Sequence, residues 1–211
     1  MRWKGFVPAI TSAVFVCVAL SGLRANAEPS TASSIAEARR TFTIDGHIIP
    51  PEIFRDFGDG DLADSETIWV TLDVKAAVGS NRYFDEIKQT GRWVSQKKIS
   101  AAGGASEETR YCYHGATRSG LVVVLASYSA GGTGVFFSLH ILDLVPNRAF
   151  DSEGKIQERI NLTHVRSIAL GDRWNGEIHV EENTVRVITT RAGPADNSGK
   201  RVTRIYEAKR P

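Results

Sequence analysis

The most apolar stretch of the chain, residues 121–145, contains side chains of the types that take part in nucleophilic catalysis, namely Ser127, Ser129, Ser138 and His140. If a four-residue loop closes this stretch into a hairpin, Ser127 lies opposite Ser138, and the three serines and the histidine share one face. A histidine that takes the proton of a serine hydroxyl activates that hydroxyl for acyl transfer. The spacing therefore gives the hypothesis of a hydrolase site formed by Ser127, Ser138 and His140.

Two features of the sequence count against this hypothesis. A Ser-His-Asp site needs an acid beside the histidine, but Asp143 is an odd number of positions from His140 and so points to the other face of a regular strand. The Gly-x-Ser-x-Gly turn, which exposes the nucleophile of many hydrolases, does not occur in the chain. We therefore interpret the hairpin serines and His140 as hydrogen-bonded polar groups of the core, and keep the hydrolase as the alternative.

A second group of chemically interesting residues lies in the predicted turn 171–176, which contains Asp172, Arg173 and Trp174. An exposed indole beside a guanidinium can hold a sugar or an aromatic peptide side chain by stacking. In the alternative interpretation, Asp172 and Arg173 pair locally and Trp174 covers the sheet edge. Trp69 is a further binding candidate, because it lies on the polar face of the strand predicted at residues 67–75. It would lose that role if the N-terminal segment covered it.

The sequence predicts no metal site and no cofactor. The acidic segment Asp56–Glu66 offers several carboxylates to a hard cation such as calcium, but its spacing does not match an EF-hand and is typical of a solvated loop. The five histidines show no close-spaced pair of the zinc-enzyme type. Cys112 and His114 share a face of one predicted strand, but neighbours at that spacing are about 7 Å apart, too far for a catalytic thiol–imidazole pair.

The distribution of apolar residues predicts an all-β domain. Residues 121–145 have almost no polar face, so both strands of this hairpin should lie mid-sheet with other elements on either side. We find no repeat and no long helix. The pattern indicates a single antiparallel β-sandwich or barrel-like domain of about eight to ten strands. The other predicted strands are 41–49, 67–75, 92–100, 109–114, 156–170, 177–181, 184–191 and 201–207, with a short helical turn at 52–57.

The first residues are typical of a secretory signal peptide. A basic start is followed by an apolar run over residues 10–20 and by the small-x-small sequence Ala25-Asn26-Ala27. The run is too short for a stable membrane anchor. We therefore predict a signal peptide over residues 1–27, a flexible tether over 28–40 and the β domain over 41–211.

Cleavage after Ala27 changes the charge of the chain. The full sequence has 26 Lys and Arg residues and 24 Asp and Glu residues, and the predicted signal peptide removes Arg2, Lys4 and Arg24 but no acid. The mature chain then carries a net charge of −1, so nothing favours a nucleic-acid partner. Cys112 remains as its only cysteine, which rules out an internal disulfide bond and favours a bacterial periplasm.

Taken together, these patterns predict a non-catalytic periplasmic binding or accessory module. Its expected partner is an envelope protein or a cell-wall glycan, and its expected binding residues are Asp172, Arg173, Trp174 and Trp69. The alternatives are a small periplasmic hydrolase that uses the hairpin serines and His140, and a purely structural envelope protein.

Overall fold

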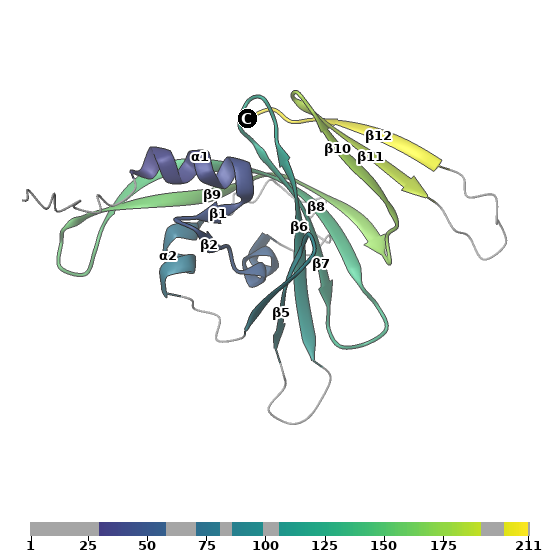
Figure 1. Ribbon diagram of the computed structural model, residues 1–211, viewed down its shortest axis with the longest axis horizontal. Helices are drawn as coiled ribbons and strands as arrows, with labels where there is room; N and C mark the ends of the chain where they lie inside the picture. The colour runs from purple at the N-terminus through teal and green to yellow at the C-terminus, as the bar shows by residue number, and fades with distance from the viewer. Residues whose placement is uncertain (1–29, 58–70, 81–85, 99–105, 191–200, 211) are drawn as a thin grey trace, which may run out of the picture.

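The computed structural model describes residues 30–57, 71–80, 86–98, 106–190 and 201–210 (Figure 1). Antiparallel strands dominate these residues, which confirms the all-β class predicted from the sequence. Seven strands form one large sheet in the order β3-β9-β8-β7-β6-β5-β4, three form a small sheet in the order β10-β11-β12, and β1 pairs with β2. None of the described helices is long and apolar enough to cross a membrane.

The elements have the following bounds. The helical segments are α1 (Thr31–Thr41), the 3-10 helix η1 (Pro51–Phe57) and α2 (Val74–Ser80). The strands are β1 (Thr43–Ile44), β2 (His47–Ile48), β3 (Thr71–Asp73), β4 (Ile87–Thr90), β5 (Trp93–Lys98), β6 (Glu107–Ala116), β7 (Val122–Ser129), β8 (Phe136–Phe150), β9 (Ile156–Asp172), β10 (Gly176–Glu181), β11 (Thr184–Thr190) and β12 (Arg201–Glu207).

Both faces of the large sheet are covered. On the face that we call the helix face, side chains such as Val124 and Leu142 form a core with α1, η1 and α2. On the opposite face, which we call the small-sheet face, Leu139 and Ile141 form a second core with strands β10 to β12. Figure 1 shows the helices and the small sheet on opposite sides of strands β6 to β9. Strands buried on both faces need apolar side chains at successive positions, as β7 has.

The central hairpin of β7 and β8 lies mid-sheet, as predicted, but its register differs from the prediction by one residue. Ser127 lies opposite Phe137, and Ser138 lies opposite Ala126. The prediction was wrong because Tyr128 and Phe136 form the last pair of these two strands, so seven residues separate the paired positions instead of the four that we assumed. A shift of one residue moves a side chain to the other face of a sheet. Ser127 therefore lies on the small-sheet face, whereas Ser138 and His140 lie on the helix face.

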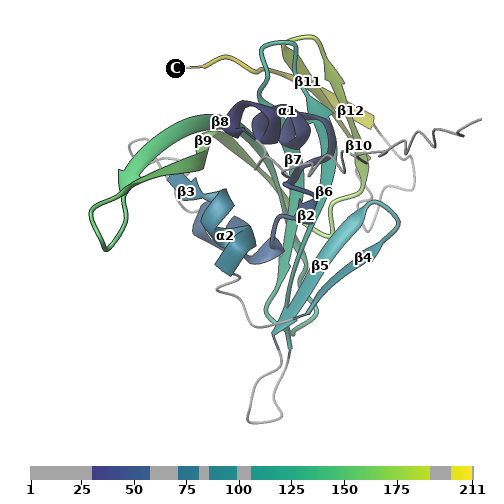
Figure 2. The same cartoon turned by 60° about the vertical axis from the view of Figure 1, so that its left-hand side comes forward.

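The segment predicted to be a flexible tether, residues 28–40, is largely helical. Ser30 caps α1 by accepting a hydrogen bond from the backbone N–H of Ser33, and Ile35 and Ala38 are buried against the large sheet. Phe42 ends the helix in the left-handed conformation, with φ 58°, and its ring lies 5.3 Å from that of Tyr111. The tether prediction was wrong because these apolar residues have helical spacing and find a partner surface on the sheet (Figure 2).

Two other predicted strands take a different form. Residues 41–49 form the β1–β2 hairpin, which turns at Asp45 and Gly46, both with positive φ. Within the described part of the strand predicted at 67–75, Thr71–Asp73 is a strand and α2 begins at Val74. Residues 67–70 and the predicted signal peptide lie outside the described residues. The helical turn predicted after Pro51 is confirmed as η1.

Candidate functional site

The turn that joins β9 to β10 brings together three of the predicted binding residues. Asp172 accepts a hydrogen bond from the backbone N–H of Val135 at 2.8 Å, and its other oxygen lies 3.2 Å from Nε of Arg173. Arg173 has φ 48° and is exposed. Asp172 and Arg173 therefore pair locally, as the alternative interpretation of this turn expected, and the pair lies at the surface beside Trp174.

Trp174 is held in one orientation by its neighbours. Its Nε1–H donates to Oγ1 of Thr189 at 2.9 Å, and its ring centroid lies 6.3 Å from that of Phe137. Gly176 leaves room for the ring, because a Cβ at this position would lie 2.5 Å from the indole and 2.1 Å from the carbonyl oxygen of Ile188. A fixed indole is pre-organised for contact with a ligand, since little rotamer entropy is lost on binding.

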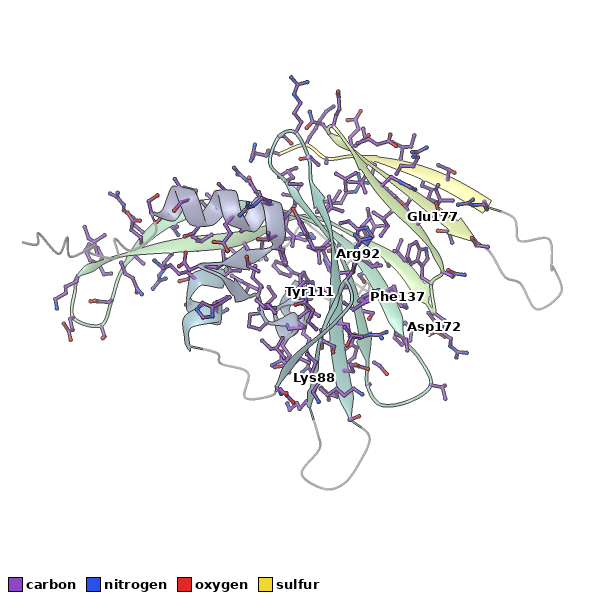
Figure 3. All side chains as sticks on the ribbon, in the orientation of Figure 1. Lys88, Arg92, Tyr111, Phe137, Asp172 and Glu177 are labelled. Atoms are coloured by element: carbon purple, nitrogen blue, oxygen red, sulfur yellow. The ribbon has the colours of Figure 1, made fainter. Side chains whose placement is uncertain are left out.

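Trp174 and Asn175 line two cavities on the small-sheet face. One has a volume of about 350 Å³ and the other about 700 Å³, both within the range of about 300–1,000 Å³ that small-molecule sites have. Figure 3 labels Arg92, Phe137, Asp172 and Glu177 on this side of the sheet. The smaller cavity is lined mainly by Asp172, Arg173, Trp174, Thr189, Arg204 and Tyr206, and the larger by Arg92, Trp93, Cys112, His114, Phe137, Trp174, Glu177 and His179.

A row of three aromatic rings forms the apolar wall of the larger cavity. The centroid of Phe137 lies 6.3 Å from that of Trp93 and 6.3 Å from that of Trp174. The guanidinium of Arg110 lies over the Trp93 ring, 5.3 Å from its centroid. Sequence reasoning identified Trp174 but missed Trp93 and Phe137, because residues from β5, β8 and the β9–β10 turn meet only through the sheet order.

Burial shifts the pKa values of two side chains that line this cavity, His114 and Cys112. Burial, together with the charge of Arg92, lowers the pKa of His114 to about 4. The Nε2 atom of His114 is buried and has no hydrogen-bond partner among the described residues. Burial also raises the pKa of the Cys112 thiol, against the opposing effect of Arg92. His114 is therefore neutral and Cys112 is protonated at pH 7, so this pair offers neither a thiolate nor a charged imidazole.

The predicted hydrolase residues Ser127, Ser138 and His140 all border one cavity, but among the described residues no hydrogen bond joins any two of them. Ser127 Oγ accepts a hydrogen bond from Nε of Arg110 at 3.3 Å on the small-sheet face. Ser138 and His140 lie on the helix face, where they line this cavity of about 210 Å³. Asp143 forms a two-pronged ion pair with the guanidinium of Arg210, at 2.5 and 3.0 Å.

His140 is instead paired with a serine that the sequence analysis did not consider. Ser167 lies opposite His140 in the β8–β9 register, and its Oγ is 2.7 Å from Nδ1 of His140. The same oxygen lies 2.9 Å from Nε2 of His164. A bulge at Val165 brings His164 and Ser167 to the same face, although their spacing in a regular strand would separate them. The alternation of faces along a regular strand predicts that His164 and Ser167 point apart, so this cluster could not be found from the sequence.

Both imidazoles of the cluster are neutral at pH 7. Burial, together with the nearby His164, lowers the pKa of His140 to about 3. Burial also lowers the pKa of His164. The ring of Phe57 lies 6.0 Å from that of His140 and 6.2 Å from that of His164. Because a neutral imidazole has one donor and one acceptor nitrogen, the Ser167 hydroxyl can donate to one ring and accept from the other.

Two segments discussed in the sequence analysis lie wholly or largely outside the described part of the chain. Trp69 and nearly all of the acidic segment Asp56–Glu66 lie outside the described residues. Within the described part of the chain, no group of three or more His, Cys, Asp or Glu residues could hold a metal ion.

Comparison of the chain with protein-family models, with curated proteins and with solved structures gave no match.

Proposed function

We propose that this chain is a periplasmic binding domain, exported by its signal peptide, and that the small-sheet face binds a glycan of the cell wall without catalysing a reaction. The observation that carries the proposal is the position of Trp174, whose ring is fixed between two cavities of about 350 and 700 Å³. The alternative partner is an envelope protein that inserts an aromatic side chain at the same place.

The groups around Trp174 favour a sugar as the ligand. The C–H face of a pyranose ring packs against the flat face of an indole, and its hydroxyl groups need hydrogen-bond partners at the rim. Asp172, Arg173 and Asn175 lie at that rim on the turn, and Glu177 follows on β10. Carboxylate and guanidinium groups form the stronger, charge-assisted hydrogen bonds with hydroxyl groups.

The chemistry of this face supports binding rather than catalysis. A catalytic site needs a nucleophile or a proton donor within reach of an activating partner. Here Arg173 is paired with Asp172, and Glu177 is paired with His179 at 3.3 Å and with Arg201 at 2.6 Å. The described residues of this face thus supply aromatic surface and hydrogen-bonding groups.

The test is co-sedimentation of the purified protein with peptidoglycan sacculi, carried out below the melting temperature of every variant. We expect Trp174→Ala to weaken binding by about 30-fold or more, the loss typical of an aromatic anchor. Trp174→Phe should keep part of the affinity, because it retains a ring. Phe150→Ala is the matched control, since Phe150 is 70% exposed at the far end of the β8–β9 hairpin.

Two results would contradict the proposal. If folded Trp174→Ala sediments with sacculi as well as the wild type does, Trp174 has no role in binding. If the wild type does not sediment with sacculi but captures an envelope protein in a Trp174-dependent way, the alternative partner replaces the glycan.

A further inference from the structure

The helix face carries a serine whose surroundings differ from those of the other hairpin serines. Ser167 is exposed, and its Oγ lies within hydrogen-bond distance of two imidazole nitrogens, 2.7 Å from His140 and 2.9 Å from His164. Ser138 also lies on the helix face. Ser127 lies on the small-sheet face, where its hydroxyl accepts a hydrogen bond from Arg110 and donates none to a histidine. An accessible hydroxyl within reach of a base is the arrangement that nucleophilic catalysis requires.

The two histidines differ in burial, and this sets the direction of the hydrogen bonds. His140 is 2% exposed, whereas His164 is half-buried. Burial disfavours the charged form of an imidazole, and this effect is smaller for the less buried ring. His164 is therefore the stronger base of the two. The Ser167 hydroxyl therefore donates to Nε2 of His164 and accepts from Nδ1–H of His140. The second bond fixes the position of the oxygen, and His140 acts as a positioning residue.

The local backbone is built around this cluster. Bulges at Val165 and Leu170 bracket the segment of β9 that contains Ser167. Without the bulge at Val165, His164 and Ser167 would point to opposite faces of the sheet. Phe54 and Phe57 pack against the His140 ring, with centroids 5.5 and 6.0 Å away, and so restrict its rotation.

We propose that Ser167 is the nucleophile of a second site, which accepts the acyl group of a small ester with His164 as its general base. This goes beyond the proposed function, because the site lies on the opposite face from Trp174. The substrate class follows from the exposed position of Ser167 beside a neutral imidazole, which a small ester can reach from solvent, since neither Ser167 nor His164 lines the cavity of about 210 Å³ that His140 borders.

The reaction needs no reagent besides the ester and water. Oγ of Ser167 bonds to the carbonyl carbon while its proton moves to Nε2 of His164. The ester C–O bond then breaks, and the leaving alcohol takes that proton, which leaves an acyl-serine. A water molecule gives its proton to His164 and attacks the acyl carbon. Cleavage of the bond to Oγ, with return of the proton, releases the carboxylic acid and restores Ser167.

The test uses the whole mature protein with phenylmethylsulfonyl fluoride as the serine reagent and p-nitrophenyl acetate as the ester. We expect peptide mass spectrometry to locate the sulfonyl adduct on Ser167. Ser167→Ala should hydrolyse the ester no faster than buffer, and His164→Gln should lower the rate by about 100-fold or more. Ser152→Ala is the matched control, since Ser152 is an exposed serine in the turn between β8 and β9, and it should keep the wild-type rate.

His140 needs a separate test, because it is buried and its replacement also changes the stability of the protein. Asparagine keeps an N–H donor near the place of Nδ1, so His140→Asn should retain more activity than His140→Leu at equal folded fraction. The proposal is overturned if folded wild-type protein carries no adduct on Ser167. It is also overturned if Ser167→Ala or His164→Gln hydrolyses the ester at the wild-type rate.

Discussion

The ring of Phe137 lies 6.3 Å from that of Trp174, with an angle of 50° between the two planes, and this contact joins the large sheet to the turn that leads into the small sheet. Phe137 thus has two roles, since it stabilises the packing of the two sheets and also lines the larger cavity. Leu125, which lines the same cavity, is almost completely buried and contributes mainly to packing.

The first prediction separates these two roles. Leu125→Ala should lower the free energy of unfolding by about 2–5 kcal/mol, as usual for truncation of a buried leucine. Phe137→Ala should lower it by less, about 1–2 kcal/mol. The Phe137 ring is only half-buried, so its removal exposes less apolar surface than the removal of a fully buried ring would. Urea denaturation followed by circular dichroism measures both values. A nearly neutral Leu125→Ala would show that this part of β7 does not hold the core together.

The second prediction concerns the docking of α1. Phe42 is 1% exposed and contacts the rings of Phe54, Tyr111 and Tyr113. We expect Phe42→Ala to destabilise the protein by about 3–5 kcal/mol. The same substitution at Phe150, which is 70% exposed, should change stability by no more than about 0.5 kcal/mol. Equal effects at the two positions would mean that α1 is not docked on the sheet.

The third prediction is a loss of stability in acid. Burial lowers the pKa of His140 to about 3 and that of His114 to about 4, whereas an unfolded histidine titrates near 6.5. The unfolded state therefore binds protons first as the pH falls. The contribution of these two histidines to stability should be constant above about pH 7.5 and should decrease between about pH 6.5 and pH 3, by up to about 1.4 kcal/mol per pH unit for each histidine.

Urea denaturation at a series of pH values tests this linkage. His140→Gln cannot take up the proton, so between pH 6 and pH 4 its stability should fall less steeply than that of the wild type. His179→Gln, a change on the exposed face of the small sheet, controls for the replacement of a histidine elsewhere. Equal slopes for the wild type and His140→Gln would show that His140 can be protonated in the folded protein.

The fourth prediction concerns export. The basic start, the apolar run over residues 10–20 and Ala25-Asn26-Ala27 together predict cleavage after Ala27. Mass spectrometry of protein recovered from a bacterial periplasm should therefore give Glu28 as the first residue. Recovery of chains that begin at Met1 in the membrane fraction would refute it.

The sequence predicted the parts of the fold that depend on strong local patterns. The absence of a polar face in β7 correctly placed this strand mid-sheet. The α2 helix was missed because alternating residues before Val74 favour a strand, whereas Val74, Ala77 and Val78 have helical spacing and turn inward. Two competing local patterns of this kind are decided by tertiary packing, which a single sequence does not display.

The candidate sites depend on features that the pattern does not encode. The β7–β8 register differs by one residue from the predicted one, which places Ser127 and His140 on opposite faces. A single bulge at Val165 places His164 beside Ser167. Both effects reverse the face on which a side chain lies, so parity arguments fail there. The turn at Asp172–Trp174 could be found because these three residues are adjacent in the chain.

The most direct test of the central claim is amide hydrogen exchange of the whole mature protein with and without a soluble peptidoglycan fragment. We predict that the fragment slows exchange in residues 171–177 and 187–190, which surround Trp174, and that Trp174→Ala abolishes this protection. Absence of any protection, or protection confined to η1 and α2 on the helix face, would contradict the account.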